Sequence, residues 1–293
     1  MNKTKTKLLA SVLTSALLLS GCSSESGSGG EYGGIKTINS PAGFTGNIGD
    51  VSIESGDTYA VITIKSFGSV TCKLFPEAAP EGVQNFIDLA NSGYYSGKEI
   101  HRVMEGFMFQ GGSRNGDGRS TDDDPSFNVE YNTDMRHFYG ALCYANGGGI
   151  NGSQFYIVNN KSYSAVSTDT LKSNIDYYEN QLDMVKEYIA NATDPDEKEY
   201  YESYKSYFES TVATAKSQLR ALNEVTDEIT AKYKEVGGTP FLDGGYTVFG
   251  QAVDGFDVID AVSAVEVEPN DSGELSHPVQ KVVIESVEIF IAE

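Results

Sequence analysis

The stretch IHRVMEGFMFQGG, residues 100–112, places two strongly hydrogen-bonding side chains in a mostly apolar segment. Arg102 stands near its start and Gln110 near its end, and glycines at 106, 111 and 112 allow sharp turns. A buried guanidinium or amide without partners costs several kcal/mol. The segment is therefore either an ordinary core strand with internally satisfied polar groups, or the wall of a site whose fixed donors meet a ligand.

Other kinds of catalytic centre find little support. The three histidines, His101, His137 and His277, are scattered, which disfavours a metal site or a Ser-His-Asp arrangement. We expect His101 to be a structural, hydrogen-bonded residue. The loop NGDGRSTDDD, 115–124, faintly resembles a calcium loop but lacks the closing glutamate, so we interpret it as a solvated loop. We therefore expect no metal and no cofactor.

Short strands with glycine-rich turns would position these residues. Residues 57–75 contain two β-branched runs around a glycine, which predicts a hairpin. One helix is indicated between Pro80 and Gly93, and another after Gly255. Further strands are expected at 140–145, 153–158, 246–253 and 281–290. This combination favours a closed or nearly closed β-barrel capped by helices.

The segment 165–236 has a different pattern. It contains no glycine from Thr168 to Val236, and its apolar residues recur at spacings of three and four. The turn NATDPDE, with Pro195 suited to a first helical turn, separates two such stripes. We predict a helical hairpin inserted in a barrel loop, with arms of about 35 and 60 Å if unbroken. The longer arm must overhang, kink or pack back on the barrel.

The N-terminal residues favour export. Residues 1–21 combine three lysines with an apolar run, which is typical of a signal peptide, and LSGC resembles a bacterial lipobox ending at Cys22. Residues 22–48 are rich in glycine and serine and predict a flexible tether. We expect a lipid anchor at Cys22 in the cell membrane, with the protein facing outside the cytoplasm. The alternative is a plain signal peptide and a chance cysteine.

The chain is strongly acidic. Its formal net charge is −21 and becomes −24 once the three lysines of the leader are removed. This charge argues against a surface that binds nucleic acid or anionic lipid. Cys72 and Cys143 lack a CxxC pattern, and we interpret them as small buried hydrophobes, with a bridge between them as the alternative. We expect a monomer.

Four sequence blocks, taken in order, resemble the cyclophilin family of peptidyl-prolyl isomerases. They are FPEAAPEGVQNFIDLANSGYYSG, IHRVMEGFMFQGG, GALCYAN with NGSQFYI, and FLDGGYTVFGQAVDGFDVID. They extend over residues 58–290 without the inserted hairpin. The resemblance implies a mainly β fold, an eight-stranded antiparallel barrel capped by two helices. That domain would occupy 49–293, interrupted by the insertion at 165–236.

The resemblance also implies the site. Arg102 matches the catalytic arginine of the family, with Phe107 and Gln110 in the same block. The implied peptide-binding positions are Met108, Ala145, Asn146, Gln154, Tyr156, Phe241, Leu242 and Tyr246. Phe241 replaces a tryptophan that, in sensitive members, donates an indole N–H to the cyclic-peptide inhibitor cyclosporin, and Tyr246 replaces a histidine. The base of the insertion should lie near these residues.

These side chains suit rotation about the peptide bond before proline. Resonance opposes that rotation with a barrier of about 18–20 kcal/mol. In the twisted transition state the prolyl nitrogen regains its lone pair, so a donor such as Arg102 stabilises that state more than either planar state. An apolar cup can hold the ring, while Gln110 and the Asn146 backbone hold the flanking peptide.

Two functions remain open at this point. The first is an anchored isomerase that acts on proline-containing segments of unfolded, exported proteins. The second is a chaperone or peptide-binding module with weak catalysis, in which the helical hairpin binds a protein partner. Intact Arg102, Phe107, Met108 and Gln110 favour the enzyme, whereas the replacements at 241 and 246 and the long insertion favour functional drift.

Overall fold

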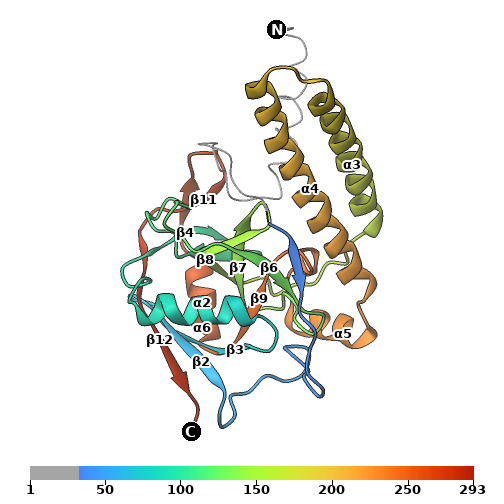
Figure 1. Cartoon of the computed structure of the whole chain (residues 1–293). Coiled ribbons are helices and arrows are strands. Elements are labelled where there is room, and N and C mark those ends of the chain that lie inside the picture. The colour runs from blue at the N-terminus through green and yellow to red at the C-terminus, as the bar shows by residue number, and fades with distance from the viewer. Residues whose placement is uncertain (1–32) are drawn as a thin grey trace.

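The computed structural model describes residues 33–293, and its centre is a closed β-barrel (Figure 1). Eight antiparallel strands follow each other around it in the order β8-β5-β4-β12-β2-β3-β9-β7, and β7 pairs back onto β8. The predicted eight-stranded antiparallel barrel is confirmed. The strands are β2 (Thr58–Ile64), β3 (Gly68–Leu74), β4 (Glu99–Met104), β5 (Met108–Gly111), β7 (Ala141–Gly147), β8 (Ile150–Val158), β9 (Val248–Asp254) and β12 (Val282–Ile291).

Alternation of side chains fills the barrel. Along β2, Ala60, Ile62 and Ile64 are buried because successive strand residues point to opposite faces. The predicted hairpin of residues 57–75 is confirmed as β2 and β3. Its turn holds Ser66 at a positive φ of 70°. The core cluster that results occupies the inside of the barrel.

Two helices cap the barrel, as predicted. Helix α2 (Pro80–Asn91) begins at a proline suited to the first turn and packs on β6, β8 and β12, with Phe86 among the rings of Phe155 and Phe249. Helix α6 (Phe256–Ser263) follows Gly255 and packs on β3, β4 and β5. The two helices overlap in the view of Figure 1, but they pack on different strands of the barrel.

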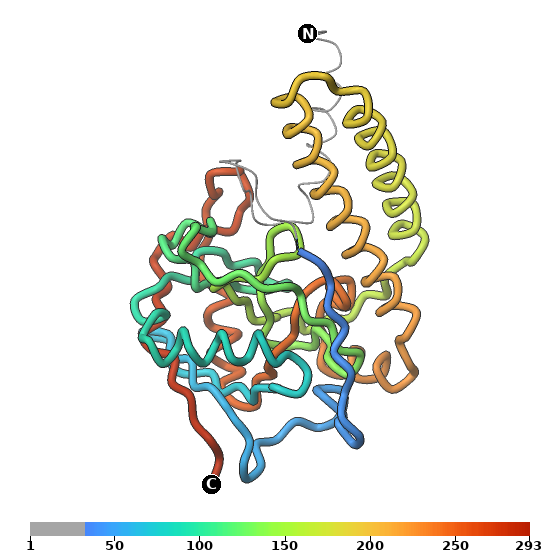
Figure 2. The backbone as a smooth tube through the Cα atoms, viewed as in Figure 1, coloured from blue at the N-terminus to red at the C-terminus, as the bar shows by residue number. Residues whose placement is uncertain are grey.

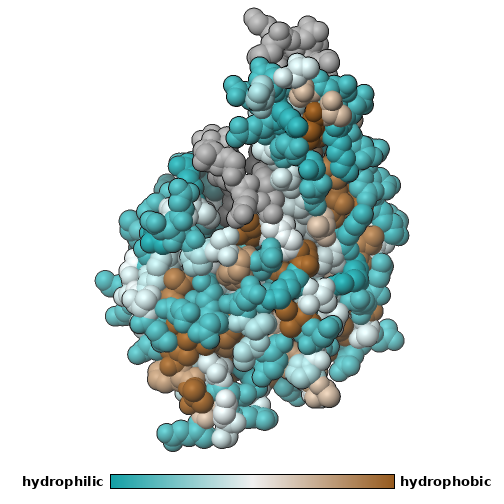
Figure 3. All heavy atoms as spheres, in the orientation of Figure 1, coloured by the Kyte–Doolittle hydropathy of each residue, from teal (hydrophilic) through white to brown (hydrophobic). Residues whose placement is uncertain are grey.

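The insertion forms the predicted helical hairpin. Helices α3 (Thr168–Asn191) and α4 (Pro195–Asn223) project from the barrel side by side (Figure 2), and their hydrophobic residues appear as a narrow line between hydrophilic flanks in Figure 3. The second arm is not continuous. A separate helix, α5 (Asp227–Val236), begins where the Thr226 hydroxyl accepts from the Ile229 backbone N–H. It packs back on the barrel because Ile229 and Tyr233 are buried against Phe138.

The expectation of a flexible tether up to residue 48 is wrong for residues 33–48. Strand β1 (Ile35–Thr37) pairs in parallel with β6 (Phe127–Tyr131), which extends the sheet beside β8. Asn47 is fully buried, where its side-chain amide donates to the Arg136 carbonyl and to Gln251. This segment is held by backbone pairing and by the Asn47 side-chain amide rather than by apolar side chains. Because the sequence there has few apolar residues, it gave no indication that the segment is ordered. The proposed leader and Cys22 lie outside the described residues.

Further expectations concern the two buried cysteines and the loop at residues 115–124. Cys72 and Cys143 are free and buried, as predicted. Within residues 33–293, no group of histidine, cysteine and acidic side chains could hold a metal ion. In the loop at 115–124, Asp124 pairs with Arg114 and accepts from the Thr121 backbone N–H. In that same described part of the chain, no helix has the length and apolar character needed to cross a membrane.

Candidate active site

Arg102, Gln110 and Tyr156 form one row across three neighbouring strands. Arg102 on β4 is the register partner of Gln110 on β5, which is in turn the partner of Tyr156 on β8. Their neighbours along these strands, Val103, Phe109 and Ile157, belong to the inner core. The row therefore lies on the outer face of the barrel, where directly opposed Cβ atoms are about 4.5–5.5 Å apart. We call this face and the apolar residues around it the Arg102 surface.

An apolar floor adjoins Arg102 and Gln110, and it includes Tyr156. Met108, Tyr156 and Leu242 are buried in one cluster with neighbours from β7 and β9. Phe107, Ala145 and Tyr246 are partly buried against the same cluster. The structure thus brings together the apolar positions that the sequence assigned to the proline ring.

Phe241 lies at the edge of this floor, exposed by 39%. Its ring lies 5.7 Å from that of Phe107, centroid to centroid. The Gln218 side-chain amide of α4 donates a hydrogen bond to the Phe241 carbonyl oxygen at 3.1 Å. The base of the insertion therefore does lie beside the site, as the order of the blocks predicted.

The amide side chains are held within the protein. Gln110 donates to the Gln154 side-chain oxygen at 3.0 Å, and Gln154 donates to the Gly118 carbonyl. The Asn146 side chain donates to the Gly245 carbonyl and accepts from the Gly149 N–H. The geometry thus fixes the orientation of these three amides next to Arg102, Tyr156 and the β7–β8 turn.

Arg102 has a partner that sequence reasoning missed. Its Nε and Nη2 donate to the two oxygens of Glu274 at 2.6 and 2.8 Å. The guanidinium also lies 5.9 Å from the centre of the Phe107 ring. Hydrogen bonds from Arg102 hold the pKa of the Glu274 carboxyl below its usual value, against the opposing effect of partial burial. The Glu274 carboxyl is therefore ionised at neutral pH.

A buried polar network supports the floor from below, and the sequence did not predict it. Asp243 accepts from the His137 backbone N–H at 2.9 Å, from His137 Nδ1 at 2.8 Å and from the Tyr233 hydroxyl at 2.8 Å. Its carboxylate lies 3.5 Å from the buried Arg136 guanidinium. His137 Nε2 lies 3.0 Å from the Tyr156 hydroxyl, so in the neutral ring it accepts from that tyrosine. Burial raises the pKa of Tyr156 well above its usual value.

His101 takes no part in this chemistry. It is buried, and burial together with the neighbouring Arg102 charge lowers its pKa to about 4. The imidazole is therefore neutral at neutral pH, in keeping with a structural role, but the expectation that it is hydrogen-bonded is not met at Nδ1. Its Nδ1 has no hydrogen-bond partner among the residues that the structure describes.

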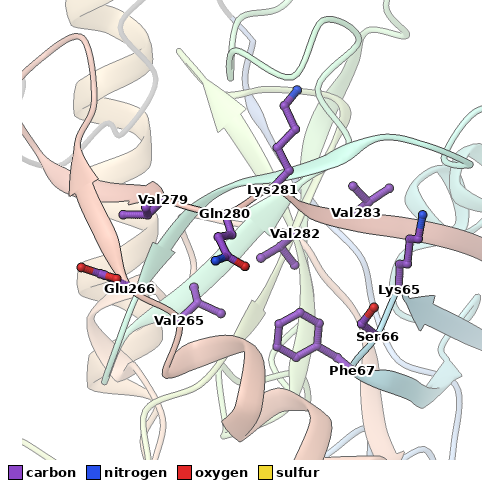
Figure 4. A pocket seen from close by; sticks show the side chains of 10 residues that line it. All are labelled: Lys65, Ser66, Phe67, Val265, Glu266, Val279, Gln280, Lys281, Val282 and Val283. Carbon is purple, nitrogen blue, oxygen red and sulfur yellow. The ribbon is translucent and has the colours of Figure 1, made fainter.

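Two cavities of about 560 Å³ lie apart from the Arg102 surface. One is bounded by the β2–β3 turn, the end of α6 and the approach to β12, with Phe67 and Val282 on its walls (Figure 4). The other lies between α5 and the barrel, next to Phe138 and Lys232. None of the predicted site residues lines either cavity.

The chain is similar to known proteins over most of its length. The family model described as "Cyclophilin type peptidyl-prolyl cis-trans isomerase/CLD" matches residues 59–173 and 191–289. A Staphylococcus saprophyticus protein named "Putative peptidyl-prolyl cis-trans isomerase" is 31% identical over 80% of this chain and 93% of its own length. A Streptococcus pyogenes protein, "Putative bifunctional phosphatase/peptidyl-prolyl cis-trans isomerase", is 34% identical over 78% of this chain. The match covers only 38% of that longer protein.

Among solved structures, a cyclophilin-type isomerase of Cryptosporidium parvum matches 80% of this chain and 98% of its own. The sequence identity is 18% and the TM-score 0.49. A second structure of that protein, in the presence of the dipeptide Ala-Pro, matches with a TM-score of 0.48.

Proposed function

The chain belongs to the cyclophilin family of peptidyl-prolyl cis-trans isomerases, and from this premise we propose that its Arg102 surface acts on proline-containing segments of exported proteins. The observation that carries the proposal is the row of Arg102, Gln110 and Tyr156 with its adjoining apolar floor. This arrangement offers a charged donor, a fixed amide and a place for a prolyl ring within neighbouring strands.

Catalysis here needs no nucleophile, only a donor that meets the twisted amide. As the bond rotates, the prolyl nitrogen becomes pyramidal and accepts a hydrogen bond that neither planar isomer can accept. Arg102 is charged at every physiological pH and is stiffened by its partners, so it supplies that donor without reorganisation. The protein therefore accelerates the reaction because it binds the twisted transition state more tightly than either planar ground state.

The remaining residues hold the peptide while one side of it turns. Met108, Tyr156, Leu242 and Phe107 receive the prolyl ring and exclude water from it. Gln110 and the backbone at Asn146 hold the segment that flanks the bond. With the ring and one flank fixed, the carbonyl before proline is the group that rotates, which lowers the entropic cost of reaching the twisted state.

Isomerisation of a short Ala-Pro peptide, followed by NMR exchange, tests the proposal. Protein that lacks residues 1–21 should raise the cis-trans exchange rate in proportion to its concentration, because uncatalysed exchange takes tens to hundreds of seconds. An exchange rate that stays at the uncatalysed value would refute the proposed activity.

A second candidate function is binding of a partner by the helical hairpin. Tyr177, Met184 and Tyr200 are large hydrophobic side chains exposed on α3 and α4. A variant in which a short glycine linker replaces residues 183–204 keeps the base of the insertion intact. If it isomerises peptides normally but no longer prevents aggregation of an unfolded protein, the hairpin has its own binding role.

The location of the protein is also a proposal. We expect Cys22→Ser to shift the protein from the membrane fraction to the soluble fraction of the cell, because serine cannot form the thioether that a lipid anchor requires. Cell fractionation and immunoblotting measure this, with Ser23→Ala as the control that should remain in the membrane. A Cys22→Ser protein that is still found in the membrane fraction would rule out anchoring through this cysteine.

Sensitivity to cyclosporin provides a further prediction. Phe241 fills apolar space beside Phe107 but has no N–H to donate, so one acceptor of the inhibitor is left unpaired. That loss costs about 1–3 kcal/mol, or roughly fivefold to hundredfold in affinity. We expect weak inhibition of the natural protein and tighter inhibition of Phe241→Trp, with similar peptide turnover. Equal inhibition constants for the two proteins would show that residue 241 does not meet the inhibitor.

A further inference from the structure

The partner of Arg102 comes from a small hairpin outside the barrel. Strands β10 (Val267–Pro269) and β11 (Leu275–Pro278) pair with each other in a separate two-stranded sheet. Strand β11 lies against β4, the strand that carries Arg102, and both β11 and β4 are labelled in Figure 1. Glu274 occupies the last position of the turn, directly before β11.

Side-chain hydrogen bonds hold this turn in one shape. The Asn270 side-chain oxygen accepts from the backbone N–H groups of Ser272 and Glu274, both at 3.0 Å. The Asn270 side-chain amide also donates to the Ser276 hydroxyl, which is buried. Such bonds fix a local turn without help from distant parts of the chain. The Glu274 carboxylate is therefore presented from a rigid support.

The pair uses one edge of the guanidinium. Nε and Nη2 donate to the two carboxylate oxygens, and Nη2 also lies 3.3 Å from Met104 Sδ. Nη1 makes no hydrogen bond to any residue that the structure describes. An arginine side chain otherwise samples many rotamers, and a two-point bond to a fixed carboxylate removes most of that freedom.

We propose that Glu274 is a positioning residue for the isomerase reaction: it holds the Arg102 guanidinium by the Nε edge so that Nη1 is the donor presented to the prolyl nitrogen. This inference rests on the proposed function and assigns a role to the β10–β11 hairpin. The carboxylate also offsets part of the arginine charge. We take orientation to be the larger effect, because a donor must be aligned to act in the transition state.

Kinetics of Glu274→Ala and Glu274→Gln test the proposal. A guanidinium that is no longer held is aligned in only a fraction of the molecules, so we expect Glu274→Ala to lower kcat about threefold to tenfold, or roughly 0.7–1.4 kcal/mol, with little change in KM. Glu274→Gln keeps one acceptor oxygen and should fall in between. The matched control is Asp271→Asn, which removes an exposed carboxylate from the same turn. It should leave both constants unchanged.

A double variant separates positioning from a general effect on folding. In an Arg102→Ala background, Glu274→Ala should cause no further loss, because the side chain that it positions is absent. NMR relaxation of the Arg102 Nε–H group reports the same contact without any turnover. It should show a more mobile Arg102 side chain in Glu274→Ala but not in Asp271→Asn.

The outcomes distinguish this inference from the proposed function. Natural protein without activity would refute the function, while an Arg102 Nε–H that is mobile with Glu274 present would refute the positioning. Unchanged kcat in Glu274→Ala would overturn the inference and leave the function standing. Faster turnover in Glu274→Ala would also overturn it, because Glu274 would then hinder Arg102 rather than align it.

Discussion

Arg102→Ala is expected to lower kcat/KM for proline isomerisation by about tenfold or more, because it removes a donor that acts only in the transition state. Its effect on stability should be small. The side chains of Arg102 and Glu274 are 14% and 31% exposed, so the carboxylate that loses its partner can be hydrated again. NMR exchange of a proline peptide and thermal unfolding of the same samples measure the two effects.

Two controls sharpen this result. Arg102→Lys keeps the charge but not the planar fork, so its activity should lie between those of alanine and arginine. Arg119→Ala removes an exposed arginine that lies 3.9 Å from Asp271, and should turn over peptide normally. If Arg102→Ala were as active as the natural protein, the catalytic role of the Arg102 surface would have to be abandoned.

Asp243→Ala should have the largest effect on stability. The carboxylate pairs with Arg136, whose side chain is 1% exposed, and accepts hydrogen bonds from His137 and Tyr233. Removing one member of a buried ion pair leaves the other charge without compensation, which costs about 3–5 kcal/mol. Urea unfolding, followed by a probe in the barrel, measures the change in the free energy of unfolding.

Two variants serve as references for that loss. Asp260→Ala breaks an exposed ion pair with Lys161 and a hydrogen bond from the Tyr139 hydroxyl, and should cost about 1 kcal/mol. Tyr233→Phe deletes one hydrogen bond to Asp243 and should cost about 1–3 kcal/mol, since part of the carboxylate then lacks a donor. An Asp243→Ala protein as stable as Asp260→Ala would show that the buried network contributes little.

Elements with a local pattern could be predicted from the sequence. Strands such as β2 alternate between buried and more exposed residues because neighbouring side chains point to opposite faces. The glycine-free heptads of 168–236 can be recognised from the sequence without any tertiary structure. The row of Arg102, Gln110 and Tyr156 could be placed through the family resemblance. The pairing of β4 with β5 and of β5 with β8 in the closed barrel then sets these three residues opposite one another.

Contacts between distant segments could not be predicted. Glu274 meets Arg102 across 172 positions, and an acidic residue in a polar turn carries no sign that it will pair. Arg136 and Asp243 are buried together although charged residues are normally exposed. Asn47 is held by amide hydrogen bonds, which hydrophobic periodicity does not detect. In each case the missing information is which other chain segment supplies the partner.

The inserted hairpin is attached to the barrel unevenly along its length. At its base, Ser210 donates to the Gly148 carbonyl and Gln218 to the Phe241 carbonyl, while Tyr233 bonds Asp243. Toward the tip, Ile189 and Tyr201 pack into a cluster that α3 and α4 form between themselves. The tip can therefore fray as a local opening of low free energy, whereas α5 unfolds only with the barrel. Unfolding of this chain is then not one cooperative transition, and probes at 188 and 233 would report different events.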